Sequence, residues 1–322
     1  MKSNIITKVK KNSFSKRKKQ DIVFYTSLFA LPCLQFLVFY VGVNLNSIIK
    51  AFLSYELNLG YGQNGYNVTF AGLKNFVLAI DAIKTNAYVF KYTFLSYATS
   101  LIIGSPLSLI FSFYVYKKFP LSKIFKVMLF MPSLISGLVF SLLFNYITTD
   151  VYITLQSKLF HNEGVTGLLY NRDTRLITVL FYNIWVSFGG KMLLYSGSMS
   201  GIDESIVESA HIDGVNMVQE FVHITLPLIY PTILQLLILG IAGIFSNQMG
   251  LMSLYGLLSS EATEMATFGM YLYIKTQNAK LYVENGISIG VLSAMGVCLT
   301  LVLLPIVVGV RKLLVKLGPS VE

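Results

Sequence analysis

The sequence predicts an all-α membrane protein with about six transmembrane helices and a short helix in the loop between the fourth and fifth spans. Three observations support this fold class. The 322 residues are 54% hydrophobic and only 12% charged, whereas soluble domains carry about 25% charged residues. The apolar residues gather into runs of roughly 20 or more, which can cross a hydrocarbon core of about 30 Å. Because every backbone amide in lipid must be paired internally, such runs are expected to be helical.

The predicted domain organisation is a basic tail at residues 1–21 followed by a membrane domain at residues 22–322. The six spans are placed at residues 22–43, 92–116, 122–147, 175–198, 227–250 and 286–310. Polar loops are expected at residues 44–91, 148–174 and 251–285, and a tight basic turn at residues 117–121. The segment 199–226 is also polar, but it is strongly patterned.

The basic residues predict the orientation. Eight of the 25 Lys and Arg residues lie within the first 19 positions, directly before the first apolar run. A basic block in this place is typical of the cytoplasmic face, with its anionic lipids, and does not indicate a nucleic-acid site. With the N-terminus inside, the inner side holds fifteen basic residues and the outer loops hold nine, which leaves only Lys191 within a span. We therefore expect both termini to be cytoplasmic.

The inner loop 199–226 breaks the basic pattern. It has no Lys or Arg and contains five acids, Asp203, Glu204, Glu208, Asp213 and Glu220. Ser205 and Glu208 have the spacing of a capping box, which predicts a helix that starts near residue 206. Gly214 favours a break after it, and Pro227 and Pro231 open the next span. The pattern predicts a short acidic helix across the inner face, which suits a protein partner better than anionic lipid.

A family resemblance is carried by the stretch Glu208-Ser209-Ala210-x-x-Asp213-Gly214-Val215-x5-Phe221-x-x-Ile224-x-Leu226-Pro227. Its spacing resembles the coupling-helix signature in the membrane subunits of ATP-binding cassette (ABC) importers. The residues that it implies for coupling to an ATPase are Glu208, Ser209, Ala210, Asp213, Gly214, Leu226 and Pro227. Ser209 and Val215 depart from the family pattern, in which alanine is usual. A capped surface helix with a glycine stop would explain Ser205, Glu208 and Gly214, but not the other positions.

Weaker flanking patterns resemble the carbohydrate-uptake branch of this family, which includes maltose, glycerol-phosphate and complex-oligosaccharide permeases. These patterns are Ala71–Phe76, Pro132–Ser133, and Trp185 with Gly189 and Leu194. The resemblance implies the pore-forming permease subunit of an ATP-driven, binding-protein-dependent sugar or oligosaccharide importer in the bacterial plasma membrane. It implies four partners: a second homologous permease, two ATPase subunits, and an extracellular solute-binding protein that meets the loops 44–91 and 251–285.

The chain itself is not expected to be an enzyme or to bind a cofactor or metal. An ATPase needs the phosphate-binding pattern G-x-x-x-x-G-K-S/T. Here the only Gly-Lys pair, Gly190–Lys191, is followed by Met192 and lacks the upstream glycine. ATP with Mg²⁺ would therefore be used by the partner ATPase.

Polar groups within the spans are candidates for the substrate path, because amides and hydroxyls pair with sugar hydroxyls and aromatic faces pack on sugar rings. These candidates are Asn183, Trp185, Ser187, Lys191, Asn247 and Gln248. The resemblance to the maltose permease places Ser187 and Asn247 near its sugar site. Lys191 could bind an acidic sugar, or its side chain could extend to the cytoplasmic interface. Lys191 lies about 16 residues into a helix that is expected to run from the outer to the inner side, and this position favours the cytoplasmic interface.

Three other functions remain as alternatives. The same machinery could carry a non-sugar solute. A secondary transporter would need about twice the spans or an internal repeat, together with acids inside the membrane for ion coupling. The sequence shows no repeat and no carboxylate well inside a span. A membrane-embedded enzyme would need clustered His, Asp or Cys residues, which are not apparent either.

Overall fold

The computed structural model describes residues 2–58, 65–256, 259–281 and 288–319, and their regular secondary structure is helical apart from one two-stranded hairpin. The chain forms two compact units. The first comprises Met1–Ala79 and Gly286–Val297, and the second comprises Ile80–Asn285 and Cys298–Glu322. The predicted all-α fold class is confirmed.

The first unit begins with one continuous helical rod. It consists of α1 (Lys2–Gln35), the π-helical turn η1 (Phe36–Gly42) and α2 (Val43–Ala51). A hairpin follows, in which β1 (Leu53–Asn58) pairs antiparallel with β2 (Gly65–Phe70). The rod is apolar enough to cross a membrane over Lys18–Ala51, and the apolar window within it is fully exposed, as expected for a helix that contacts lipid.

The buried Asn75 side chain closes the end of this rod. It lies on α3 (Lys74–Thr85), is 3% exposed, and its Nδ2 donates to the carbonyls of Ala51 and Leu53 at 2.9 and 2.8 Å. The Ala51 carbonyl ends α2, where the helix can no longer pair it, and the Leu53 carbonyl belongs to the first residue of β1. The side chain therefore joins α3 to the point where the rod turns into the hairpin.

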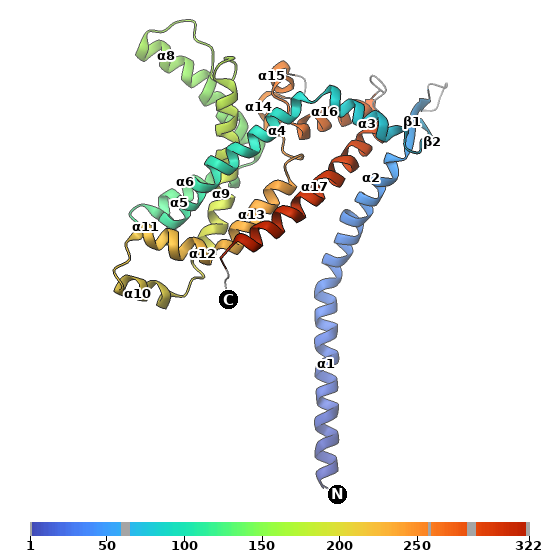
Figure 1. Ribbon diagram of the computed structural model, residues 1–322, viewed down its shortest axis with the longest axis vertical. Coiled ribbons are helices and arrows are strands. Elements are labelled where there is room, and N and C mark those ends of the chain that lie inside the picture. Colours follow the sequence, from blue (N-terminus) through green and yellow to red (C-terminus); the bar gives the residue numbers. More distant parts are fainter. Residues whose placement is uncertain (1, 59–64, 257–258, 282–287, 320–322) are drawn as a thin grey trace. The chain divides into compact units, whose positions relative to one another are not determined.

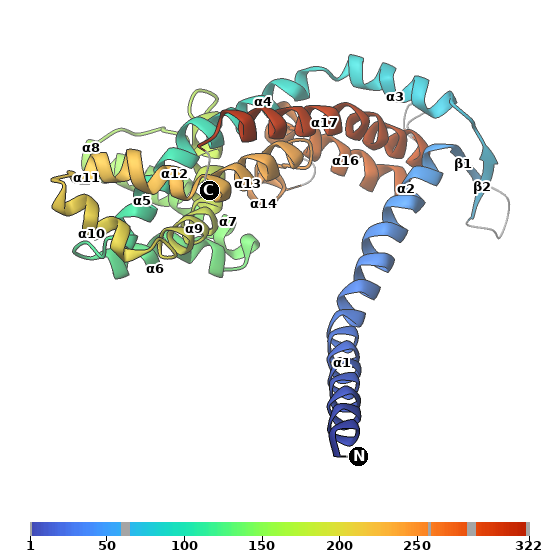
Figure 2. The ribbon, with the colours of Figure 1, turned by 60° about the horizontal axis from the view of Figure 1, so that its bottom comes forward.

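The regular secondary structure in the described part of the second unit is entirely helical. Its elements are α4 (Tyr88–Thr99), η2 (Ser100–Gly104), α5 (Ser105–Tyr116), α6 (Ser122–Leu134), α7 (Gly137–Tyr146), η3 (Ile147–Val151), α8 (Tyr152–Phe160), α9 (Arg175–Met199), α10 (Glu204–Ile212), α11 (Met217–Gln219), η4 (Glu220–Thr225), α12 (Leu226–Leu228), α13 (Tyr230–Ala242), α14 (Leu251–Tyr255), α15 (Ser260–Glu264), α16 (Phe268–Leu281) and most of α17 (Ile289–Leu317). Figure 1 shows α10 beyond one end of α9, and α14 and α15 near its other end. In Figure 2, α10 and α14 again lie on opposite sides of α9.

Helix α9 is central to the second unit because α5 and α6 both pack against it. A Cβ atom on Gly189 would lie 2.8 Å from the Leu129 carbonyl and 2.9 Å from Phe130 Cα, so only glycine allows α6 to approach this closely. On the side of α5, the buried Ser112 hydroxyl donates to the Met192 carbonyl at 3.0 Å. Small residues and interhelical hydrogen bonds are the usual means of packing membrane helices.

Within the described residues, five helices are long and apolar enough to cross a membrane, and a bent pair would make a sixth. The five cover Lys18–Ala51, Tyr88–Tyr116, Gly137–Phe160, Arg175–Met199 and Ile289–Leu317. The bent pair is Met217–Leu228 with Tyr230–Ala242, at 68° to each other. The predicted number of about six spans is therefore confirmed.

The predicted third span, a single helix over residues 122–147, is wrong. α6 ends at Leu134, Ile135 and Ser136 adopt extended backbone, and α7 starts again at Gly137. The apolar helix then continues through η3 and α8 to Phe160, into a region predicted to be a loop. Hydropathy alone did not show this break because the apolar run continues across it, although Pro132 and the Ser136–Gly137 pair lie beside it.

Candidate functional site

A cavity of about 420 Å³ lies among α4, η2, α5, α9, α13 and the turn after α13. This volume is within the range of small-molecule sites, roughly 300–1,000 Å³. Its polar lining residues are Tyr97, Ser100, Ser105, Asn183, Ser187, Lys191 and Asn247. Leucines, Ile244 and two glycines complete the wall. Four of the six predicted substrate-path residues, Asn183, Ser187, Lys191 and Asn247, therefore lie around one space, although they come from two distant parts of the sequence.

Two of the predicted amides converge on a serine that the sequence did not single out. Asn183 Nδ2 and Asn247 Nδ2 both donate to Ser96 Oγ, at 3.2 and 3.1 Å. Ser96 is buried on α4, with 1% of its surface exposed. Asn247 Oδ1 also accepts from the Met249 amide at 2.9 Å, which orders the turn after α13. The two amides are thereby held in fixed positions on the cavity wall.

The Lys191 side chain is part of the cavity lining. Its Nζ donates to Ser100 Oγ at 2.9 Å. Ser100 is the first residue of the π-helical turn η2, near the middle of the span Tyr88–Tyr116. Lys191 precedes the end of α9 by eight residues, or about 12 Å of helix. The interpretation that the sequence favoured, in which Lys191 extends to the cytoplasmic interface, stays a prediction, and the lining position favours the alternative of a ligand contact.

The remaining candidates have different surroundings. Ser187 lines the cavity, and its hydroxyl donates to the Ile184 carbonyl of its own helix at 3.0 Å. Trp185 is not among the lining residues. Its ring packs against Phe140, Phe144 and Phe181 with centroid distances of 5.2, 6.3 and 5.7 Å. Gln248 is half-buried and also lies outside the lining.

The second candidate site is the short helix α10, between the spans formed by α9 and α13. It begins at Glu204, and Asp203 is its N-cap, with the carboxylate accepting from the Ser205 amide at 3.0 Å. The predicted capping box at Ser205 and Glu208 is therefore wrong, because an acceptor two residues earlier starts the helix sooner. The Ser205 amide, and secondarily its hydroxyl, hold the pKa of the Asp203 carboxyl below its ordinary value.

The end of α10 is defined by backbone hydrogen bonds around Gly214. The Gly214 amide donates to the His211 carbonyl and the Val215 amide donates to the Ala210 carbonyl, at 3.1 and 3.0 Å. This pair of bonds is the Schellman motif, which needs a left-handed residue at the position of Gly214. Gly214 has φ +80°, and a Cβ atom there would meet nothing within 4 Å. Its requirement for glycine is therefore conformational and not steric.

The faces of α10 differ in polarity. Val207 and Ala210 are buried, whereas Glu208 is exposed and Ile212 is 86% exposed. The Ser209 hydroxyl donates back to the Ser205 carbonyl at 2.8 Å, and Asp213 is exposed at the helix end. An exposed face with carboxylates beside a large apolar side chain is suited to a protein partner.

Glu220 anchors α10 to the membrane helices, a role that the sequence did not predict. It is 1% exposed, and Lys117 Nζ lies 2.5 Å from its Oε1 as an ion pair without hydrogen-bond geometry. His211 Nε2, on α10, lies 3.0 Å from Oε2. Lys117 directly follows α5, so Glu220 connects the loop helix with the end of that span.

Apolar contacts surround this anchor. The Phe221 ring packs on Phe113 of α5 with a centroid distance of 4.9 Å. Phe113 belongs to a buried cluster with Tyr195 and Met199 of α9 and with Ile229, where the fifth span bends. Leu226 and Pro227 form α12 directly before this bend, and both are half-buried. The predicted loop residues are thus connected to the spans that line the cavity.

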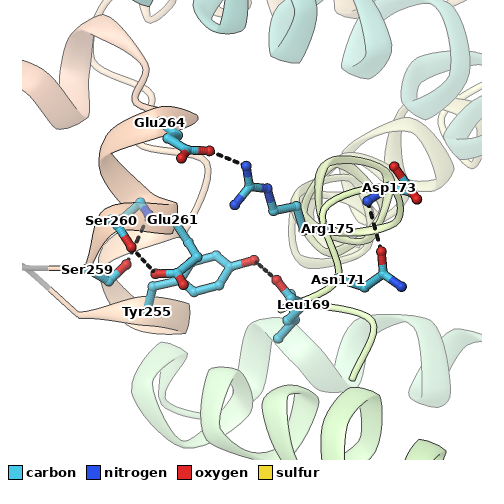
Figure 3. Close-up of polar contacts among 10 residues, drawn as sticks. Leu169, Asn171, Asp173, Arg175, Tyr255, Ser259, Ser260, Glu261 and Glu264 are labelled. Atoms are coloured by element: carbon cyan, nitrogen blue, oxygen red, sulfur yellow. Dashed lines mark hydrogen bonds and ion pairs between the residues drawn. The ribbon is translucent and has the colours of Figure 1, made fainter. Parts of the chain in front are cut away.

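The other end of α9 carries a separate polar cluster (Figure 3). The Arg175 guanidinium pairs with the Glu264 carboxylate of α15, and the Tyr255 hydroxyl donates to the Leu169 carbonyl at 2.8 Å. Burial raises the pKa of Tyr255 above its ordinary value. Hydrogen bonds from its own backbone amide and from the Ser260 hydroxyl lower the pKa of Glu261. The contacts join the predicted loops 148–174 and 251–285 at one end of the unit.

A bundle of apolar helices with a cavity that contains polar side chains, and with a capped helix between two cavity-lining spans, is typical of a multi-pass membrane transport protein. Residues 104–317 match the family described as the inner membrane component of binding-protein-dependent transport systems. The chain belongs to this family. It is a permease component and not a catalytic subunit, so the resemblance predicted from the loop motif is confirmed.

Relatives of known type support the same assignment. The chain is 27% identical over 232 residues to the probable starch degradation products transport system permease AmyD of Thermoanaerobacterium thermosulfurigenes, covering 70% of this chain and 78% of that protein. It is 27% identical over 276 residues to the polygalacturonan/rhamnogalacturonan transport system permease YteP of Bacillus subtilis, covering 81% and 82%. The predicted resemblance to the carbohydrate-uptake branch is therefore confirmed.

A solved structure shares the fold. It is the crystal structure of a bacterial alginate ABC transporter in complex with an alginate pentasaccharide-bound periplasmic protein. The TM-score is 0.67 at 21% sequence identity, and the match covers 91% of this chain and 94% of that chain. The likeness extends over nearly all of the helices described above.

Proposed function

We propose that this chain forms half of the translocation pore of an ATP-driven saccharide importer, and that its 420 Å³ cavity is part of the path of the saccharide. The single observation that carries the proposal is the physical connection between the loop helix and the cavity. α10 lies between α9 and α13, both of which line the cavity, and Glu220 ties it to α5, a third lining helix.

The polar groups of the cavity suit a saccharide. Asn183 and Asn247 are anchored on Ser96 through one N–H each, and each side chain retains further hydrogen-bonding capacity for ligand hydroxyls. The relatives point the same way, because their names include starch degradation products and polygalacturonan. These names cover neutral and acidic saccharides, so the relatives alone leave the charge of the substrate open.

The proposed partners follow from the family. A periplasmic-type binding protein would deliver the saccharide, as one accompanies the related alginate transporter. A second homologous permease would complete the pore. Two ATPase subunits would bind ATP with Mg²⁺, and one of them would receive the exposed Glu208 and Ile212 face of α10.

The contacts support the proposed orientation, with both termini cytoplasmic. The Lys117–Glu220 pair brings the basic turn 117–121 and the loop 199–226 to one end of the unit, and both were predicted inside. The Arg175–Glu264 pair brings two predicted outer loops together at the other end of α9. The basic residues of the N-terminal tail then favour the anionic inner leaflet.

The test is a pair of substitutions at Gly214 in the complete transporter, isolated with its partners and reconstituted in proteoliposomes. In Gly214→Val, a β-branched residue must adopt φ +80°, which costs at least about 1–2 kcal/mol and opposes the Schellman motif. We expect saccharide uptake and saccharide-stimulated ATP hydrolysis to fall about tenfold or more, while the subunits still purify together.

The matched control is Gly214→Asn, because asparagine tolerates the left-handed conformation and the position is open to a side chain. Asn should retain most of the uptake. If Gly214→Val transports and hydrolyses like the wild type, α10 does not couple the ATPase to the pore. If no saccharide stimulates hydrolysis in the wild type, the proposed substrate class is wrong.

A further inference from the structure

We propose that Lys191 is the specificity-determining residue of the cavity and that it binds the carboxylate of an acidic saccharide. The inference rests on the proposed function, because it assigns the charge of the substrate in the same cavity. It depends on the surroundings of one side chain, which determine what its ammonium group can bind.

In the described ranges of the chain, no opposite charge lies beside the ammonium of Lys191. No carboxylate belongs to the cavity lining, and the described part of the chain shows no salt bridge to Lys191. The Lys191 Nζ atom donates a hydrogen bond to the neutral hydroxyl of Ser100, at 2.9 Å. An ammonium has three N–H donors, so donors remain for a ligand in the cavity. A cation at this depth of a membrane protein is costly unless an anion or water compensates it.

The position of the group also suits a ligand contact. Lys191, Asn183 and Ser187 follow one face of α9 at spacings of four, and all three line the cavity. Asn247 borders the same cavity from the turn after α13. Two amides and a hydroxyl can therefore bind the hydroxyl groups of a sugar ring while the ammonium binds a carboxylate on the same molecule.

A carboxylate fits this site better than a phosphate group. Both are anions and would form short charge-assisted hydrogen bonds with an ammonium. A phosphate ester carries about −1.5 to −2 charges and three acceptor oxygens. Among the described residues, Lys191 is the only Lys or Arg in the lining, so these residues provide a single positive charge. This charge matches the single negative charge of a uronic acid.

The test compares three saccharides in the reconstituted complete transporter: a disaccharide with one uronic acid residue, its methyl ester, and a phosphorylated disaccharide. Uptake is measured with the binding protein saturated by each saccharide, so that its own affinity does not affect the comparison. The ratio of acid to ester uptake is the readout. We expect the wild type to favour the acid, and Lys191→Met to lower the ratio about tenfold to a hundredfold, as expected for one charge-assisted hydrogen bond.

Two further variants test whether the preference for the acid depends on a positive charge at position 191. Lys191→Arg retains the positive charge and should keep the preference for the acid. Lys126→Met removes an exposed lysine of α6, outside the cavity, and should leave both uptake rates unchanged. Assembly is checked by co-purification of the partner subunits. If the Met variant does not assemble, the wild-type ratio and the Arg variant still decide the proposal.

The outcomes separate this inference from the proposed function. Uptake of the ester at a rate equal to that of the acid, or a ratio that does not change in Lys191→Met, would overturn the inference and leave the saccharide importer in place. A preference for the phosphorylated disaccharide would overturn the assignment of a carboxylate. Failure to transport any saccharide would overturn the proposed function, and the inference with it.

Discussion

Two charges in the interior of the second unit, Glu220 and Lys191, have opposite surroundings. Glu220 is 1% exposed and has a basic side chain on each oxygen, Lys117 at 2.5 Å and His211 at 3.0 Å. Lys191 has a serine hydroxyl and lines a cavity. The first charge is compensated within the chain, whereas the second is directed toward a space that can hold a ligand.

The difference separates a structural charge from a binding charge. A buried ion is retained in a folded protein when a partner balances its lost hydration. Glu220 has that balance, and it holds α10 against α5. Lys191 lacks it, so an external anion is needed to complete the site. If this distinction is correct, two changes should have opposite effects on the free energy of unfolding. Breaking the Glu220 ion pair should lower it, and removing the Lys191 charge should raise it.

The largest effect is expected for Lys117→Met. This substitution leaves the Glu220 carboxylate buried with only the half-exposed His211 beside it, and breaking a buried pair costs about 3–5 kcal/mol. The Nζ atom also lies 5.8 Å and 5.7 Å from the ring centroids of Phe113 and Tyr116, and these contacts would be lost as well. The free energy of unfolding in detergent should fall by this amount, and α10 should exchange its amide hydrogens faster.

The double variant Lys117→Met with Glu220→Met is the control for that result. It replaces the ion pair by apolar side chains of similar length, a change that is often neutral or stabilising for buried pairs. Stability should return close to the wild-type value. If the double variant is as unstable as the single one, packing and not charge explains the loss, and Glu220 is not an electrostatic anchor.

A smaller effect of opposite sign is expected for Lys191→Met. Methionine retains an unbranched apolar chain but removes an ammonium that has no carboxylate beside it. The free energy of unfolding should rise by about 1 kcal/mol, because residues kept for binding are commonly unfavourable for stability. The measurement is thermal or denaturant unfolding of the purified protein without saccharide. A clear loss of stability would show that Lys191 is a structural residue and would weaken the comparison.

The sequence predicted some of these features and missed others for physical reasons. Gly214 and the short helix before it were predictable, because a helix stop depends on local backbone conformation. The ion pair of Glu220 was not, since Lys117 is 103 residues away and only the packing of the helices brings them together. Ser96 was missed because serines in membrane helices mostly bond their own backbone, as Ser108 does with the Gly104 carbonyl.

The arrangement of the cavity residues also could not be predicted from the sequence alone. Asn183 and Asn247 were selected from residue type and family resemblance, but their convergence on one serine depends on how α4, α9 and the turn after α13 pack. Trp185 has the residue type expected for a sugar contact, yet it packs among phenylalanines. Residue type therefore identified candidates for the site, and tertiary packing determined which of them share the cavity.

The smallest expected effect concerns a third charge, Asp203, which is exposed and belongs to neither class. Hydrogen bonds from Ser205 lower the pKa of its carboxyl below the ordinary value of 3.8. A group with a lowered folded-state pKa stabilises the fold above the unfolded value, and this contribution is lost as the pH falls through the folded value. The N-terminal turn of α10 should therefore lose hydrogen-exchange protection below about pH 4, while the Glu220 anchor keeps the rest of the loop in place.

Asp203→Asn should abolish this pH dependence with most of the protection retained, because asparagine is an equally good N-cap. Asp203→Ala should lower the protection at every pH. Equal protection in all three proteins would show that the anchor alone holds α10 and that its cap contributes nothing.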